Sequence, residues 1–267
     1  DYHPERRVLT VPEVFIHSSN IGTARMALAV GLERHIAFLR RVGLFDRVVT
    51  ELPESARPLL PKRWSKLAQA TASFGHGFAV QPLQGISVVA GLLNGGNLIP
   101  PTFIKRARAE ADVLAKRIVK PETSEALRYL FRLNAQEGTA TKANVIGYRV
   151  GGKTGTAEKI VDGRYSKTKN LTSFIGAFPM DNPKYLVMVT KHHDGVALGV
   201  GAGDLHRVLH RLGAGVEQRR ALLVVAGGEA VERLAHLDVS RVRRDHEAGV
   251  REQLGLLLHA ADDLGIR

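Results

Sequence analysis

The feature that most limits how this chain can fold is an abrupt change of composition near residue 191. All nine Phe, all five Tyr, the one Trp, and every Lys, Pro and Met lie at or before Lys191. The residues that follow are rich in Leu, Val, Arg, Ala and Gly and contain seven of the eleven His. A shift this sharp marks either a new domain or a change in how the gene was read. We therefore divide the chain into residues 1–191 and an atypical tail, 192–267.

Two interpretations of the tail stay open. Lys, Phe, Tyr, Asn and Ile, which the tail lacks or nearly lacks, mostly use A/T-rich codons, which favours out-of-frame translation of a G/C-rich gene. The apolar residues of Glu229–Leu264 are loosely spaced as in helices, which favours a genuine helical tail. The nucleotide sequence decides, because a frameshift requires another frame after codon 190 to encode a recognisable ending. The histidines lack metal-ligand spacing, so we predict no metal site.

Charge and cysteine content exclude several classes of function. The net charge of +12 arises from residues 1–191, whose scattered basic residues predict a solvated surface. A basic domain can attract nucleic acid, anionic lipid or an anionic glycan precursor. No zinc-finger or RNA-binding signature is present, so nucleic acid is not an expected partner. The chain has no Cys, which excludes disulfides and thiolate metal sites, and no apolar run is long enough to span a bilayer.

The order of predicted elements indicates an α+β fold. Apolar spacing and Gly or Pro punctuation predict one or two helices in residues 22–42 and a single helix in each of 82–93 and 122–133. Strands are predicted at 148–159, 171–178 and 185–190, with turns at Asp162-Gly163 and Asp181-Asn182-Pro183. A helical block followed by an antiparallel meander is typical of α+β domains.

Two short motifs carry the chemistry. Gly151–Thr156, GGKTGT, resembles a phosphate-binding loop, but its residue order is wrong and a strand replaces the required helix. The alternative is the K-T-G triplet of serine acyl-transfer enzymes, a weak signal alone. Ser18-Ser19-Asn20 lies far upstream, just ahead of a predicted helix, where a lone SSN is best explained as a helix N-cap. The two motifs together, in this order, are far more specific.

Longer stretches around these motifs resemble class B penicillin-binding proteins. They are LTVPEVFIHSSNIGTARMAL, ASFGHGFAVQPLQ, GYRVGGKTGTAEK and TSFIGAFPMDNPKYLVMV. Within the class, the sequence is most similar to the septal, FtsI-type enzyme of cell division, and the resemblance covers residues 1–190. It implies a partial penicillin-binding/β-lactamase-like transpeptidase fold, a helical subdomain plus an antiparallel sheet.

The resemblance also implies an activity and a setting. The family consists of D,D-transpeptidases that cross-link peptidoglycan stem peptides and are acylated by β-lactams. They work without a cofactor on the periplasmic face of the bacterial inner membrane, with divisome proteins as partners. Two other classes remain as alternatives, a penicillin sensor that binds without turnover and a serine β-lactamase. The latter typically has a shorter separation between its SSN and KTG motifs.

The resemblance assigns roles to the motif residues. Ser18 is the serine whose hydroxyl relays a proton to the leaving nitrogen, and a hydroxyl suits this because it can donate and accept. Ser19 packs or caps, and Asn20 holds the peptide carbonyl of the substrate. Lys153 supplies positive charge near the terminal carboxylate of the substrate.

Three further residues of the KTGT motif are assigned to substrate binding. Thr154 and Thr156 offer hydroxyl groups to the same carboxylate, and the N–H of Thr156 is one donor of the oxyanion hole. Gly155 has no side chain, which lets the substrate lie close to the strand. An extended stem peptide would pair with the strand edge. We interpret His76 as part of a glycine-flanked turn and Glu158 as a strand-end charge.

The first motif of the family, S-x-x-K, is absent at its expected place. It supplies the nucleophilic serine and the lysine that activates it, one helical turn apart. The pattern occurs only at Ser166–Lys169, in a polar hairpin after the KTGT motif. We expect the true motif to lie upstream of Asp1, and we expect this chain alone to be inactive.

Overall fold

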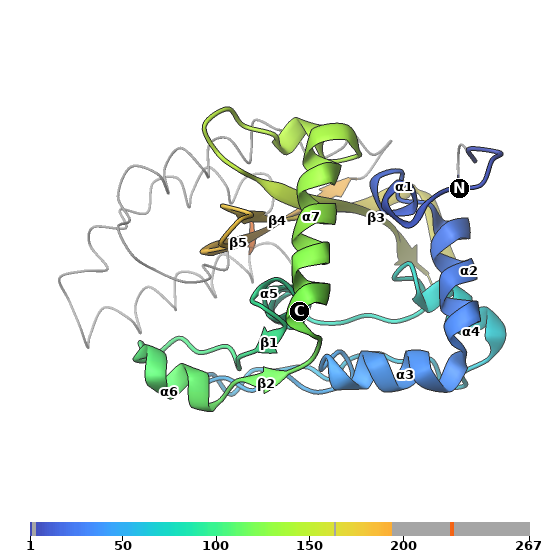
Figure 1. Ribbon diagram of the computed structural model, residues 1–267. Coiled ribbons are helices and arrows are strands. Elements are labelled where there is room, and N and C mark those ends of the chain that lie inside the picture. The colour runs from blue at the N-terminus through green and yellow to red at the C-terminus, as the bar shows by residue number, and fades with distance from the viewer. Residues whose placement is uncertain (2–3, 163, 194–224, 227–267) are drawn as a thin grey trace.

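The computed structural model describes residues 1, 4–162, 164–193 and 225–226 (Figure 1). The predicted helical spacing of residues 229–264 lies outside these residues. The helices are α1 (Val11–Ile16), α2 (Asn20–Val30), α3 (Leu32–Arg41), α4 (Lys66–Ala72), α5 (Pro82–Leu93), α6 (Arg108–Val113) and α7 (Pro121–Glu137), with a short 3₁₀ turn η1 (Thr141–Ala143). The strands are β1 (Asn97–Leu98), β2 (Lys116–Arg117), β3 (Gly151–Val161), β4 (Arg164–Phe178), β5 (Tyr185–His193) and β6 (Val225–Ala226). The predicted α+β class is confirmed.

Helices are present in all three predicted stretches, and residues 22–42 form two of them, as one of the two alternatives allowed. The stretch 22–42 is divided into α2 and α3 at Gly31, whose φ of 90° interrupts the helix. Helix α5 begins with Pro82, as predicted, because proline needs no N–H partner in a first turn. Helices α1, α4 and α6 were not predicted, since six or seven residues are too short to show a helical period.

The main sheet has the strand order β3-β4-β5-β6. The pairs β3–β4 and β4–β5 are antiparallel, and β6 runs parallel to β5. Strand β4 begins earlier than the predicted strand at 171, because its polar first part pairs with the end of β3. Across the first turn Val161 pairs with Arg164, on either side of the predicted Asp162-Gly163 turn. Strand β3, which carries the KTGT motif, therefore lies at the edge of the described sheet.

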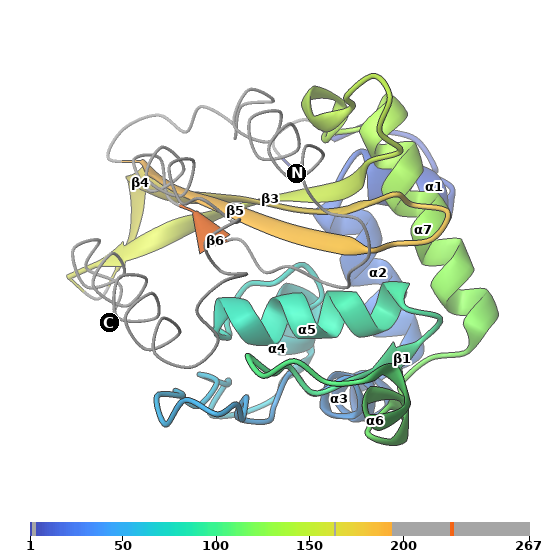
Figure 2. The same ribbon diagram turned by 90° about the vertical axis from the view of Figure 1, so that its left-hand side faces the viewer.

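The two faces of the sheet pack against different parts of the chain. Alternate residues of β4 and β5 join two clusters of buried apolar side chains. The first cluster contains Ala135, Ala140, Ala143, Val150, Phe174, Phe178, Val187 and Val189. The second contains Ile86, Leu93, Phe131, Ala177, Met180 and Leu186. Figure 2 shows α5 lying along the face of the sheet that carries the second cluster, with α7 at the end of the sheet. Among the described residues, no helix is long and apolar enough to cross a bilayer.

The turn between α5 and β1 packs closely against Val119, and this contact can be tested. Gly95 and Gly96 both have positive φ, of 62° and 82°. A Cβ atom on Gly96 would lie 2.2 Å from the Val119 carbonyl oxygen, whereas nothing lies within 4 Å of one on Gly95. We expect Gly95→Ala to cost about 1 kcal/mol of unfolding free energy, the cost of a left-handed Ala. Gly96→Ala should cost about 2–4 kcal/mol, because the backbone must also shift. Equal losses of unfolding free energy for the two variants in denaturant titrations would contradict the close contact between Gly96 and Val119.

Candidate functional site

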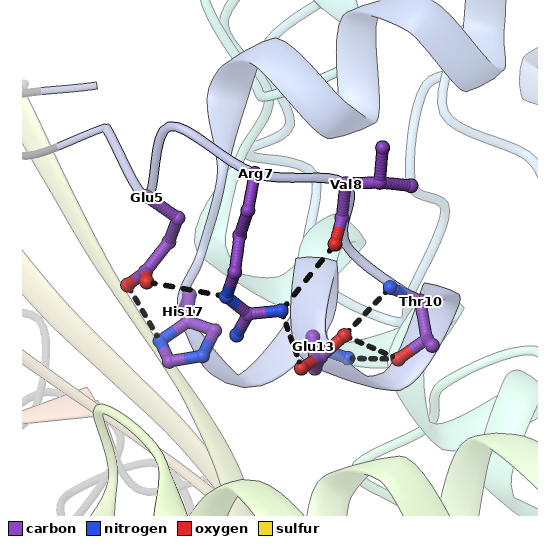
Figure 3. A network of polar contacts seen from close by, with 6 residues as sticks. All are labelled: Glu5, Arg7, Val8, Thr10, Glu13 and His17. Carbon is purple, nitrogen blue, oxygen red and sulfur yellow. Dashed lines mark hydrogen bonds and ion pairs between the residues drawn. The ribbon is translucent and has the colours of Figure 1, made fainter.

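A network of polar contacts holds the segment that leads to the SSN motif (Figure 3). The Thr10 N–H donates to Glu13 Oε2 at 2.7 Å, and the Thr10 hydroxyl caps the first turn of α1. Arg7 lies 2.8 Å from Glu13 Oε1, and His17 Nδ1 lies 3.4 Å from Glu5 Oε1. The hydrogen bonds from Thr10, with help from Arg7, lower the pKa of Glu13 to about 2. Both ends of α1 are thereby tied to the chain that precedes it.

The SSN motif forms a tight turn between α1 and α2. Ser18 has a φ of 55° and an exposed side chain. Ser19 is buried, and its hydroxyl accepts a hydrogen bond from the Gly22 N–H at 3.1 Å, so it caps α2. The Asp1 carboxylate accepts from Ser19 Oγ at 2.7 Å and from the N–H of Asn20 at 2.6 Å. The Asn20 side chain is exposed on the first turn of α2.

The structure brings the two motifs together through Lys153. Its Nζ atom donates to Ser18 Oγ at 2.6 Å and to the Thr154 carbonyl oxygen at 3.1 Å, and it lies 5.9 Å from the centre of the Phe15 ring. No carboxylate of the described residues forms an ion pair with this amine. Burial lowers the pKa of Lys153 to about 8. Roughly a tenth of such amines are neutral at pH 7, so the group can both supply and take up a proton.

Among the described residues, no strand pairs with the outer edge of β3 beyond Lys153. Residues of an antiparallel strand alternate in the direction of their N–H and C=O groups. The carbonyl groups of Gly152 and Thr154 point away from β4, because they accept from Asn134 and Lys153. The same alternation turns the N–H and C=O of Thr156 outward, beside its exposed side chain. This edge can pair with an extended peptide.

Two other KTGT residues have neighbours that the sequence did not predict. The Thr154 hydroxyl lies 2.8 Å from the hydroxyl of Thr139, in the loop after α7. A Cβ atom on Gly155 would lie 2.9 Å from Ser173 Oγ on β4. The absence of a side chain at Gly155 thus leaves room for the Ser173 side chain.

The structure brings Ser18, Lys153 and Thr154 into one hydrogen-bonded set, and Asn20 and Thr156 lie exposed near its two ends. It also reveals two participants that sequence reasoning missed, Thr139 and the buried Asn134. A faint signal was present for the second one. Asn is a poor helix former, and Asn134 stands among good ones near the end of α7.

The remaining candidates lie elsewhere. The His76 ring is 4.8 Å from the Tyr165 ring, between Gly75 and Gly77, which both have positive φ, in agreement with a turn. Ser166 and Lys169 lie on β4, so their S-x-x-K pattern has no helical geometry. Ser166 Oγ accepts from the Lys169 N–H at 3.0 Å. Within the described ranges, no group of His, Asp and Glu side chains could hold a metal ion.

The lowered pKa of Lys153 leads to a prediction about stability. Between pH 8 and 10.5 the unfolded chain binds more protons at Lys153 than the folded chain, so the free energy of unfolding gains from this residue as the pH rises. Lys153→Met removes this contribution. We expect the denaturation midpoint of the unaltered chain to rise relative to that of Lys153→Met from pH 8 to pH 10. A difference that is constant over this range would contradict the lowered pKa.

Known proteins match most of the chain. Residues 1–205 match the penicillin binding protein transpeptidase domain. The chain is 36% identical over 246 residues to the probable peptidoglycan D,D-transpeptidase FtsI of Caulobacter vibrioides, covering 85% of this chain and 42% of the relative. It is 35% identical over 191 residues to stage V sporulation protein D of Bacillus subtilis, covering 67% of this chain and 30% of the relative. The chain thus spans less than half the length of these relatives.

Solved structures agree with the sequence relatives. The transpeptidase domain of penicillin-binding protein 3 from Burkholderia pseudomallei is 34% identical, with a TM-score of 0.61 over 66% of this chain and 54% of that one. Penicillin-binding protein 3 from Mycobacterium tuberculosis, in complex with ampicillin, is 29% identical, with a TM-score of 0.65 over 76% of this chain and 50% of that one. The expected resemblance and fold are confirmed. The chain belongs to the penicillin-binding protein transpeptidase family, and FtsI-type enzymes are among its relatives.

Proposed function

We propose that this chain forms two of the three motif-bearing walls of a peptidoglycan D,D-transpeptidase, which cross-links stem peptides during septal wall synthesis. The observation that carries the proposal is the 2.6 Å contact between Lys153 Nζ and Ser18 Oγ. It joins the two motifs whose side chains would move the proton of an acyl transfer. A hydroxyl beside an amine with a pKa of about 8 suits that step near neutral pH.

The proposed reaction uses Ser18 as a proton relay. A nucleophilic hydroxyl from the S-x-x-K motif adds to the carbonyl of the penultimate residue of the stem peptide, and the C–N bond to the last residue then breaks. The proton of the attacking hydroxyl passes to the lysine of the S-x-x-K motif. The leaving nitrogen takes the proton of Ser18 Oγ, which recovers one from Lys153. The proton held by the S-x-x-K lysine then restores the charge of Lys153. Lys153 in its charged form attracts the terminal carboxylate. The net result is an acyl-enzyme and a free amino acid.

Substrate binding is assigned to the open part of β3 and to α2. The outward backbone groups of Thr156 would pair with an extended peptide or with a β-lactam, and its N–H would stabilise the oxyanion. The hydroxyl groups of Thr154 and Thr156 would bind the carboxylate. Asn20, exposed beside Ser18, would hold the peptide carbonyl.

We infer that the S-x-x-K wall comes from a segment outside this sequence and that this chain alone is not acylated. Helix α2 supports this inference, because Ile21 and Leu28, which lie seven positions apart on one face, are 50% and 43% exposed. Large apolar groups this exposed on one helix favour packing against a further element. We also propose that the complete enzyme acts on the periplasmic face of the inner membrane, with divisome proteins as partners. The division at residue 191 stays a prediction.

A chimera tests the proposal directly. The residues of the Caulobacter vibrioides relative that precede the matched region would be joined ahead of Asp1. We expect a fluorescent penicillin to label this chimera covalently and to leave the unjoined chain unlabelled. Ser18→Ala and Lys153→Met should each slow labelling by about 10²–10⁴-fold, as expected for loss of an acid–base group.

Ser166→Ala provides the matched control, since it removes the serine of the other S-x-x-K pattern and should leave the rate of labelling unchanged. Covalent labelling of the unjoined chain would contradict our placement of the nucleophile. A chimera that folds, as judged by circular dichroism, but is not labelled would contradict the proposed function. Rapid release of hydrolysed penicillin would favour a β-lactamase, and labelling without cross-linking of stem peptides would favour a penicillin sensor.

A further inference from the structure

A single buried amide connects three segments behind the site. Asn134 has an exposed fraction of 0% and lies in the last turn of α7. Its Nδ2 atom donates to the Gly152 carbonyl oxygen at 2.7 Å. Its Oδ1 atom accepts from the Thr139 N–H at 3.1 Å and lies 3.3 Å from the Thr139 hydroxyl. A buried amide with both ends hydrogen-bonded is costly to misplace, because any displacement leaves a polar atom without a partner.

On one side this amide fixes the backbone next to Lys153. The Gly152 carbonyl belongs to the residue directly before the lysine. It points away from β4, toward the side on which β3 has no strand partner among the described residues. One step earlier along the same edge, Arg132 Nη1 donates to the Val150 carbonyl oxygen at 2.7 Å. The side chains of Arg132 and Asn134 therefore make the hydrogen bonds that a neighbouring strand would make, up to Gly152.

On the other side the amide holds the loop that touches the SSN turn. The Thr139 N–H, which donates to Asn134, also donates to the Ile16 carbonyl oxygen at 3.2 Å. Ile16 is the last residue of α1, two positions before Ser18. The Thr139 hydroxyl lies 2.8 Å from that of Thr154. This second set of contacts bridges the same two segments as the contact between Ser18 and Lys153.

We propose that Asn134 and Thr139 are positioning residues, which set the separation of Lys153 from Ser18 and orient the Thr154 hydroxyl for the acyl transfer proposed above. They touch no reacting atom. They act through the Gly152 carbonyl, the Ile16 carbonyl and the Thr154 hydroxyl. The effect of these residues on acyl transfer rests on the proposed function. Their effect on the position of Lys153 rests on the hydrogen bonds alone.

The two residues divide this task. Asn134 controls the position of the strand, because its Nδ2 atom holds the Gly152 carbonyl. Thr139 controls the direction of the Thr154 hydroxyl, because the Thr139 hydroxyl lies between that hydroxyl and the Asn134 amide. Asn134 is buried and Thr139 is exposed, so substitutions of Thr139 perturb the core less.

The geometric consequence can be measured in the chain without any catalysis. The test is an NMR pH titration of 13Cε-labelled lysine, with the Lys153 signal identified by its loss in Lys153→Arg. In the unaltered chain we expect a pKa of about 8. Asn134→Leu, similar in shape but without the amide, should move it toward the ordinary 10.5, because the strand shifts and water reaches the amine.

Gln84→Leu is the matched control. Gln84 is also a buried amide, 3% exposed, and its Nε2 atom donates to the carbonyl oxygens of Gly43 at 2.8 Å and Asp46 at 2.5 Å, neither of which belongs to β3. It should lower the melting temperature as Asn134→Leu does and leave the pKa of Lys153 unchanged. An Asn134→Leu chain that stays folded with the pKa still at about 8 would overturn the proposal, and so would an equal shift in Gln84→Leu.

The catalytic consequence is tested at Thr139 in the chimera described above. Thr139→Val keeps the shape and loses the hydroxyl, and it should lower the affinity for penicillin before acylation by about tenfold, the loss of one hydrogen bond. Thr139→Ser restores the hydroxyl and should restore the affinity. Equal affinities in the two variants would overturn the role of Thr139. A chimera with no labelling at all would contradict the proposed function, and the titration would still test the positioning role.

Discussion

The contact between Lys153 and Ser18 is the interaction on which the site depends, and it is costly to maintain. The amine is removed from water without a carboxylate among the described residues to compensate for it, and its lowered pKa is a measure of that cost. A lysine on a mobile strand would turn its ammonium group into solvent. The arrangement is stable only if the strand that carries Lys153 is held from both sides, by β4 on one and by α7 on the other.

The residues around the motif supply that restraint. Gly151 and Gly152 precede Lys153, and side chains at these positions would collide with their surroundings. A Cβ atom on Gly151 would lie 2.6 Å from Met180 Cγ, and one on Gly152 would lie 2.3 Å from Phe174 Cζ. The two glycines thus let the strand pack against the core up to the lysine. Beyond the half-buried Thr154, residues 155–158 are exposed. The same strand is buried where it needs rigidity and exposed where the proposed function places a ligand.

The sequence predicted the parts of this structure that have local signals. The amphipathic α5 and α7 have clear periods and proline starts, and the strand around Lys153 is flanked by turn residues, so each was identified within a few positions. The roles of Ser18 and Lys153 came from recognising motifs and not from geometry. No local pattern could show that these two residues lie 2.6 Å apart.

What the sequence missed depends on contacts between distant segments. The short helix α1 owes its start to the Thr10–Glu13 capping box, a four-residue signal that periodicity does not detect. Thr139 is an exposed threonine in a loop, and such residues usually have no structural role. Its importance follows only from its position between Ile16 and Thr154, which lie far apart in the sequence.

This division explains why motif residues alone do not define such a site. Ser18, Lys153 and Thr156 are the groups that a ligand would meet, so the chemistry of the reaction fixes their identity. Asn134 meets no ligand, and its identity is fixed by the need to satisfy one carbonyl and one N–H in a buried space. A side-chain amide presents a donor and an acceptor side by side and so satisfies both groups. Folding therefore restricts the residue at position 134 as strictly as the reaction restricts the residues at positions 18, 153 and 156.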